Sequence, residues 1–130
     1  MSDSANLTPV EQRQVLFYED EITAVVADDT SGRTVYIPIR PICIHLGIAW
    51  DPQRRRILRD PVLSGVVKGV TVTVTPGGPQ EMICLPLKFL PGWLFGISAS
   101  RVKNDLQEKI IRYQRECYDV LAEAFKEGRL

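Results

Sequence analysis

The chain has 130 residues, of which 45% are hydrophobic and 25% charged, and its 16 basic side chains balance 16 acidic ones. Such a length and composition belong to one globular domain and exclude a disordered or fibrous protein. No apolar run reaches the ~18 residues that a membrane span needs, and the polar start lacks the basic and apolar regions of a signal peptide. We therefore expect a cytoplasmic protein without a membrane anchor.

The first part of the chain predicts a tail followed by an antiparallel three-stranded meander. Residues 1–13 are polar, and we expect a flexible tail there, ahead of a single domain over residues 14–130. Three short runs rich in apolar and β-branched residues are separated by acidic and glycine-containing turns. These runs predict strands over residues 15–18, 22–26 and 34–37.

The next stretch predicts two short helices, over residues 38–47 and 51–60. Two prolines suit the first turn of the first helix, where a missing N–H costs little, and Gly47 suits its end. Asp51 is a favourable N-cap for the second helix, and Pro61 ends it. The sequence therefore predicts a helix pair joined by a glycine-containing turn.

The second helix of this pair is rich in arginine. Acidic residues predominate over residues 1–30 and basic residues over residues 31–70. The outline is that of a DNA-binding helix-turn-helix, although two short helices also occur in many proteins that never contact DNA. We expect an anionic partner here, either nucleic acid or an acidic protein surface. The alternative is that the acidic first part of the chain folds onto this basic region and neutralises it within the protein. The candidate nucleic-acid-binding residues are Gln53, Arg54, Arg55, Arg56 and Arg59.

The following stretch predicts a β-hairpin and a short helix. Over residues 66–85 an alternating apolar and polar strand leads into a proline- and glycine-rich turn and a returning apolar run. Pro86 can open a short helix, which Pro91 and Gly92 interrupt. The dense apolar run over residues 93–97 is expected in the core.

A long carboxy-terminal helix is predicted from a cap at Ser98 or Ser100 to about residue 125. Its apolar residues form one stripe at spacings of three and four and a second stripe that repeats every seven. Since packing on its own sheet needs only the first stripe, we expect a homo-oligomer that buries the second. The alternative is that the amino-terminal strands cover it within one chain. The candidate interface residues are Ile111, Tyr118 and Phe125.

Together these elements predict an α+β fold: an antiparallel strand meander and a β-hairpin, with a short helix pair between them and a long C-terminal helix. The cysteines are odd in number and widely spaced, so we expect reduced, buried residues at Cys43, Cys84 and Cys117. His45 is the single histidine, and we expect its side chain to be satisfied on a partly buried helix. No nucleophilic set and no zinc ligand set can be assembled around it. We expect neither an enzyme nor a bound metal or cofactor.

Several blocks of sequence occur in the order typical of one family. They are IPIRPICIHLGI at 37–48, Trp50 and Gln53, DPVL at 60–63, CLPL at 84–87, GWLF at 92–95 and RYQRECYDVL at 112–121. Over about residues 14–125 the chain therefore resembles the amino-terminal domain of phage antirepressor proteins, a relative of the Bro-N domain of phage and large-virus proteins.

This resemblance implies a regulator without enzymatic activity that acts in the lysis–lysogeny switch of a phage or prophage. Family members relieve a repressor, and the Bro-N relatives are regarded as DNA-binding. We expect a transcriptional regulator that binds DNA through its basic helix. The alternative is a protein-binding antirepressor that docks on a phage repressor without contacting DNA. Many antirepressors continue into a separate carboxy-terminal domain, and any activity that resides there is not expected of these residues.

Overall fold

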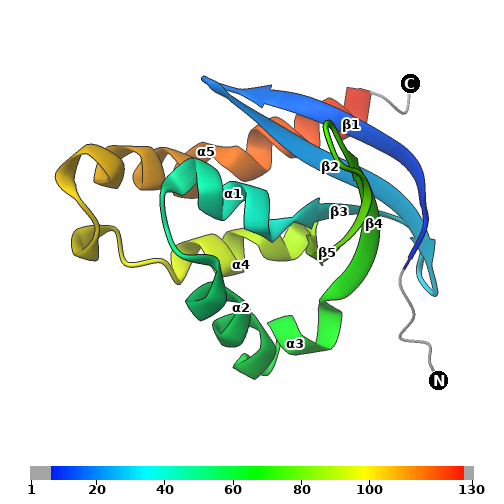
Figure 1. The fold of residues 1–130 in the computed structure, drawn as a ribbon, viewed down its shortest axis with the longest axis horizontal. Helices are drawn as coiled ribbons and strands as arrows, with labels where there is room; N and C mark the ends of the chain where they lie inside the picture. The colour runs from blue at the N-terminus through cyan, green and yellow to red at the C-terminus, as the bar shows by residue number, and fades with distance from the viewer. Residues whose placement is uncertain (1–6, 128–130) are drawn as a thin grey trace.

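A five-stranded antiparallel sheet organises the computed structural model, which describes residues 7–127. The strands lie in the order β1-β2-β3-β5-β4, and the predicted meander and hairpin are both present (Figure 1). The two groups join because the last three residues of β3 pair with the last three of β5. The strands are β1 (Pro9–Phe17), β2 (Asp20–Asp29), β3 (Gly32–Pro38), β4 (Lys68–Val74) and β5 (Gly78–Pro86).

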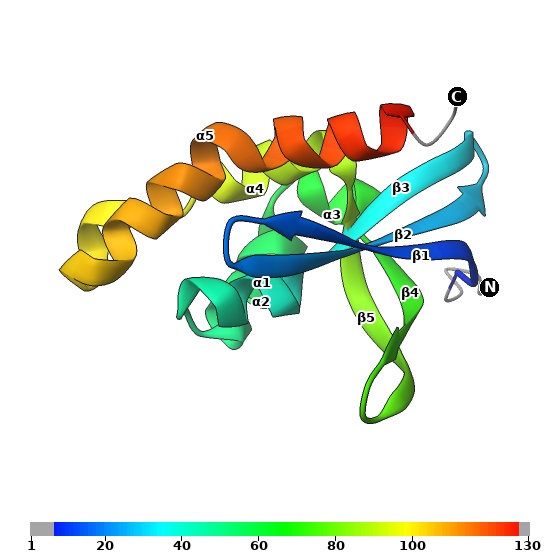
Figure 2. The same cartoon turned by 90° about the horizontal axis from the view of Figure 1, so that it is seen from above.

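The predicted helix pair and long C-terminal helix are also present, which confirms the α+β fold. Figure 2 shows the long helix lying across one side of the molecule, with the β4–β5 hairpin projecting away from it. The helices are α1 (Ile39–Leu46), α2 (Trp50–Arg59), α3 (Leu63–Val66), α4 (Leu90–Phe95) and α5 (Asn104–Glu127), with two short 3-10 turns, η1 (Leu87–Phe89) and η2 (Ala99–Arg101).

The main core lies between the sheet and the helices. Buried side chains of α5 recur at spacings of three and four, as the first apolar stripe predicted. They pack with buried side chains of α1, α4 and the inner face of the meander. The burial predicted for the cysteines is confirmed at Cys43, Cys84 and Cys117.

The first and last strands of the sheet also meet each other. The backbone of Leu7 accepts a hydrogen bond from Thr71 N (3.0 Å) and donates one to Gly69 O (2.8 Å). The side-chain amide of Gln12 bonds both backbone groups of Thr73, at 2.7 and 2.9 Å. The curled sheet encloses a second, smaller apolar cluster, formed by Val25, Ala27, Tyr36, Val70, Val72 and Cys84.

The amino-terminal boundary differs from the prediction. β1 begins at Pro9, so residues 9–13 belong to a strand and not to a flexible tail, and residues 1–6 of the predicted tail lie outside the described residues. β1 is an edge strand whose side chains are mostly exposed up to Gln14. Polar residues are tolerated there because pairing with β2 is made by the backbone, and no apolar alternation marks the strand.

Several helical details also differ. α5 begins at Asn104, not at Ser98 or Ser100, because a 3-10 turn occupies residues 99–101. Pro91 does not interrupt α4 but lies in its first turn, where a missing N–H is tolerated. Phe95 is 66% exposed and lies outside the core, because the two preceding residues take the inward face of α4. The short α3 was not predicted.

Gly47 ends α1 as predicted. Its φ of +70° lies in the left-handed region, and its N–H bonds the carbonyl groups of the last turn. A Cβ at this position would lie 3.0 Å from the Leu106 side chain of α5. Glycine therefore both terminates α1 and lets α5 pass close to the turn between the paired helices.

Candidate partner-binding surface

The sequence of α2 determines which of its arginines reach solvent. Ile57 is the fully buried side chain of this helix, so at ~100° per residue Arg55 and Arg59 lie on the opposite side. Both are exposed, and among the described residues neither has an ion-pair or hydrogen-bond partner. These two side chains are available to a ligand.

One flank of α2 is tied into the protein. Gln53 Oε1 accepts hydrogen bonds from the Trp93 indole Nε1 (3.0 Å) and from the Arg56 guanidinium (3.0 and 3.1 Å). Arg56 also donates to the carbonyl oxygen of Trp93 (2.8 Å), and it lies against Gly96, where a Cβ would collide with it. Burial lowers the pKa of Arg56. Two of the five predicted binding residues thus hold α2 against α4.

A groove of about 470 Å³ lies between the helix pair and strand β5. Its side chains come from both helices and from the β4–β5 hairpin. Ile44 is the most exposed apolar residue among them, at 71%. The apolar lining is Pro41, Ile44, Trp50, Met82 and Ile83, and the polar lining is Arg40, Gln80 and Glu81.

The second flank of α2 continues this groove. Trp50, Arg54 and Leu58 follow one another at four-residue spacing, so they form one ridge, and Trp50 lines the groove. Leu58 is 45% exposed. We call this region the helix-pair surface. It comprises Arg40, Ile44, Trp50, Arg54, Arg55, Leu58 and Arg59, whose arginines outnumber the neighbouring acidic residues Asp51 and Glu81.

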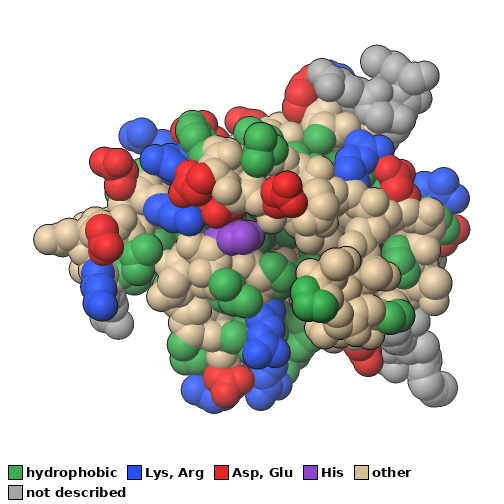
Figure 3. Space-filling view, turned by 45° about the horizontal axis from the view of Figure 1, so that its top comes forward, with side chains coloured by type: hydrophobic (Ala, Val, Ile, Leu, Met, Phe, Trp, Pro, Cys, Tyr) green, Lys and Arg blue, Asp and Glu red, His purple; other side chains and the backbone are tan. Residues whose placement is uncertain are grey.

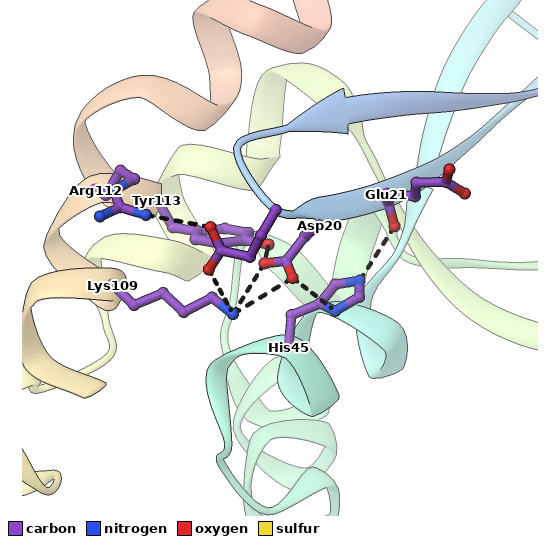
Figure 4. A network of polar contacts seen from close by, with 7 residues as sticks. Asp20, Glu21, His45, Lys109, Arg112 and Tyr113 are labelled. Carbon is purple, nitrogen blue, oxygen red and sulfur yellow. Dashed lines mark hydrogen bonds and ion pairs between the residues drawn. The ribbon is translucent and has the colours of Figure 1, made fainter. Parts of the chain in front are cut away.

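A second group of charged residues, the hairpin-tip cluster, is built differently (Figure 4). Asp20 at the start of β2 has only 10% of its side chain exposed. Its carboxylate accepts a hydrogen bond from the Tyr113 hydroxyl (2.6 Å) and lies 3.0 Å from Lys109 Nζ. His45 Nδ1 lies 3.5 Å from the same carboxylate, and its Nε2 lies 3.1 Å from the carbonyl oxygen of Glu21.

These contacts set the ionisation of the hairpin-tip cluster. Burial alone would raise the pKa of Asp20, but hydrogen bonds from Tyr113 and Lys109 outweigh it, so the pKa lies below its usual value. Burial, and then the hydrogen bond to Asp20, raise the pKa of Tyr113. His45 is half-buried and has a polar group at each ring nitrogen, as expected. The cluster therefore fastens the β1–β2 hairpin to α1 and α5.

The family model described as the P22_AR N-terminal domain matches residues 13–130. The chain belongs to this family. The match extends from the middle of β1 through α5, so it confirms the resemblance that the sequence blocks indicated. Membership makes the chain a phage regulatory protein. No curated protein and no solved structure matches the chain.

The three residues of the predicted oligomer interface of this P22_AR N-terminal domain differ in exposure. Phe125 is only 6% exposed, because the Arg13 guanidinium of β1 stacks on its ring at 4.5 Å and donates to the Ala124 carbonyl. The amino-terminal strand therefore covers Phe125 within one chain, as the alternative stated. Ile111 and Tyr118 are 41% and 39% exposed, and their burial by a second copy stays a prediction.

Sequence reasoning missed the part of the helix-pair surface that lies outside α2. Arg40 and Ile44 are four residues apart on the exposed side of α1, and this spacing could have marked them. Met82 could not have been found, because only the folded hairpin brings it to the groove. Within residues 7–127, no cluster of metal-ligating side chains is present and no helix is long and apolar enough to cross a membrane.

Proposed function

We propose that this phage regulatory domain acts by docking on another protein through the helix-pair surface. The observation that supports the proposal best is the apolar groove between the helix pair and β5, flanked by arginines that have no partner among the described residues. Tryptophan and arginine around an apolar pocket are typical of the energetic centres of protein interfaces.

The chemistry of the groove indicates the kind of partner. Ile44 and Trp50 offer apolar contact area, and Arg40 and Arg54 lie beside them. A segment that inserts an apolar side chain and carries carboxylates next to it would satisfy both. An amphipathic helix with acidic flanks has this pattern, and helices commonly bind in grooves of this kind. The partner is therefore an acidic amphipathic segment of another protein, with the phage repressor as the first candidate.

Reading of DNA bases is less well supported. Helix-turn-helix proteins contact bases with the amino-terminal residues of their second helix. Here Asp51 places a carboxylate at that end of α2, and Gln53 is already bonded to Trp93 and Arg56. The net charge of zero gives no general attraction to DNA. The second candidate function is phosphate binding by Arg54, Arg55 and Arg59, which the freedom of these side chains favours.

One pair of variants tests the docking proposal. Ile44→Glu places a carboxylate in the groove, and the matched control Leu16→Glu places one on β1, where the side chain is 67% exposed. Binding to the purified repressor of the same phage is measured by calorimetry. We expect Ile44→Glu to weaken it at least ~10-fold, the range of one interface anchor, and Leu16→Glu to leave it unchanged.

The same proteins distinguish the second candidate. Binding to a 30-base-pair duplex is measured at several salt concentrations with the native chain and with an Arg54→Ala, Arg55→Ala, Arg59→Ala variant. Phosphate binding predicts that the logarithm of the binding constant falls steeply with the logarithm of the salt concentration. In the variant this slope should be smaller by about one unit for each lost contact. Repressor binding unaffected by Ile44→Glu, together with such a slope, would favour DNA over the protein partner.

A further inference from the structure

A second cleft, of about 540 Å³, lies at the opposite end of strand β3 from the helix pair. The tip of the β2–β3 hairpin, η1 and the start of β4 form its walls. Helix α3 contributes Gly65, and α5 contributes Tyr118. It shares no lining residue with the groove of the helix-pair surface. Its volume is that of a typical small-molecule site.

Three basic side chains line this cleft, and each comes from a different element: Arg33 from β3, Lys68 from β4 and Lys88 from η1. Among the described residues, the Lys68 ammonium has no partner, and Lys88 contacts only the Phe89 ring at 5.5 Å. Arg33 pairs with Asp28 at 3.2 Å, but both side chains are more than half exposed, so the pair is weak. All three cations can therefore meet an anionic ligand.

Asp29 is the acidic residue in the lining, and its negative charge is outnumbered by the three cations. Asp29 accepts hydrogen bonds from Ser31 N (2.8 Å), Ser31 Oγ (2.6 Å) and the Tyr36 hydroxyl (2.6 Å). These bonds hold the pKa of Asp29 well below its usual range. Asp29 uses its oxygens to shape the hairpin turn, and the lining keeps an excess of positive charge for a ligand.

The remaining wall is aromatic and apolar. Phe89 and Tyr118 both line the cleft, together with Val35 and Leu87. Tyr118 is 39% exposed although it lies beside the core stripe of α5, so part of its ring is open to solvent. Exposed aromatic rings beside cations offer a planar ligand a stacking surface.

We propose that this cleft binds a nucleotide, with its phosphate at Lys68, Lys88 and Arg33 and its base against Tyr118 or Phe89. Phosphate alone would leave the aromatic wall unused, and an uncharged planar ligand would leave the lysines unused. The volume fits a mononucleotide better than a folded macromolecule. This binding site goes beyond the docking function and does not depend on it. It competes with the predicted burial of Tyr118 by a second copy, because both would use the same ring.

The test uses the purified chain titrated with AMP, adenosine and inorganic phosphate, observed by amide chemical shifts. We expect AMP to bind at least ~10-fold more tightly than either fragment, with the largest shifts at Gly65 and Lys88, because only AMP contacts both walls. A Lys68→Ala, Lys88→Ala variant and a Tyr118→Leu variant should each weaken AMP binding ~10-fold. The matched control is a Lys103→Ala, Lys126→Ala variant, which removes exposed lysines outside the cleft.

Several results would overturn the proposal. The first is the absence of saturable shifts with millimolar AMP, and the second is phosphate or adenosine binding as tight as AMP. A third is equal loss of binding in the control and cleft variants. An eight-residue oligothymidylate separates a free nucleotide from a single-stranded nucleic acid, and tighter binding of the oligomer than of AMP contradicts a mononucleotide site. Circular dichroism confirms that each variant is folded, so weaker binding reports on the cleft.

Discussion

The hairpin-tip cluster and the helix-pair surface are both rich in charge, yet they are opposite in construction. In the cluster, Asp20 is nearly buried and has bonds from Tyr113 and Lys109. On the surface, Arg55 and Arg59 are exposed without a partner among the described residues. Figure 3 shows basic and acidic side chains interspersed on the face that carries the histidine. The residue type therefore does not reveal the role of a charge; burial and pairing do.

Removal of the Asp20 carboxylate should give the largest loss of stability among these substitutions. Asp20→Ala leaves the Lys109 ammonium and the Tyr113 hydroxyl without their buried acceptor, and we expect the free energy of unfolding to fall by about 3 kcal/mol. Urea denaturation measures the loss. The control Asp51→Ala removes an exposed carboxylate and should change stability by less than about 0.5 kcal/mol. Equal effects of both substitutions would contradict the distinction.

The link between α2 and α4 should give the next largest effect. Gln53→Ala removes the acceptor of the buried Trp93 indole N–H and of the Arg56 guanidinium, which costs about 1–3 kcal/mol. Tryptophan fluorescence during unfolding reports this change. Arg54→Ala, on the other flank of the same helix, is the matched control and should have little effect. If Gln53→Ala is neutral, the residue is available for binding after all.

The pH dependence of stability sharpens the comparison further. Because the pKa of Asp20 is lower in the folded chain than in the unfolded one, its contribution is present above the unfolded value of about 3.9 and is lost as the pH falls through the folded value. Asp20→Asn mimics the protonated state. The difference in unfolding free energy between the native chain and the variant should shrink as the pH falls below about 4. A difference that grows as the pH falls below about 4 would mean that the pKa of Asp20 is raised in the folded chain, not lowered.

The smallest effect on stability should come from the surface itself. Simultaneous change of Arg54, Arg55 and Arg59 to Ala should alter the free energy of unfolding by less than about 0.5 kcal/mol, because none of them has a partner within the described chain. Binding to the repressor should nevertheless fall at least ~10-fold. Thermal unfolding and calorimetry on the same sample check both statements. A marked loss of stability would mean that these arginines serve the fold.

Periodicity predicted the order of the elements but not how they join. The alternation from Val70 onward and the stripes of α5 each depend on neighbours in sequence, and both elements are present. The pairing of β3 with β5 depends on residues almost fifty positions apart, which no local pattern encodes. The sequence predicts Pro91 as a helix breaker, because its position within the first turn depends on where the helix begins.

The sequence likewise predicts part of the helix-pair surface, namely its arginines, but not which of them are exposed. The arginine cluster itself was visible, but the sequence could not tell that Arg56 points inward while Arg55 points to solvent. That distinction depends on Trp93, which lies 40 positions from Gln53 and accepts Arg56 at its carbonyl. Likewise Phe125 looked available for a partner because Arg13, which covers it, comes from the other end of the chain. Tertiary contacts over such separations decide which polar and apolar side chains remain free.

The closure of the sheet limits how this protein can aggregate. Strands at the border of a sheet normally expose a row of unpaired peptide groups, which act as a template for fibril growth. Here the side-chain amide of Gln12 hydrogen-bonds the backbone N–H and carbonyl of Thr73 in β4, as a peptide group would. The backbone of Leu7 hydrogen-bonds Gly69 and Thr71 of the same strand. Part of the exposed backbone of β4 is thus already occupied. Over that part of its border the protein is protected from growing into fibres.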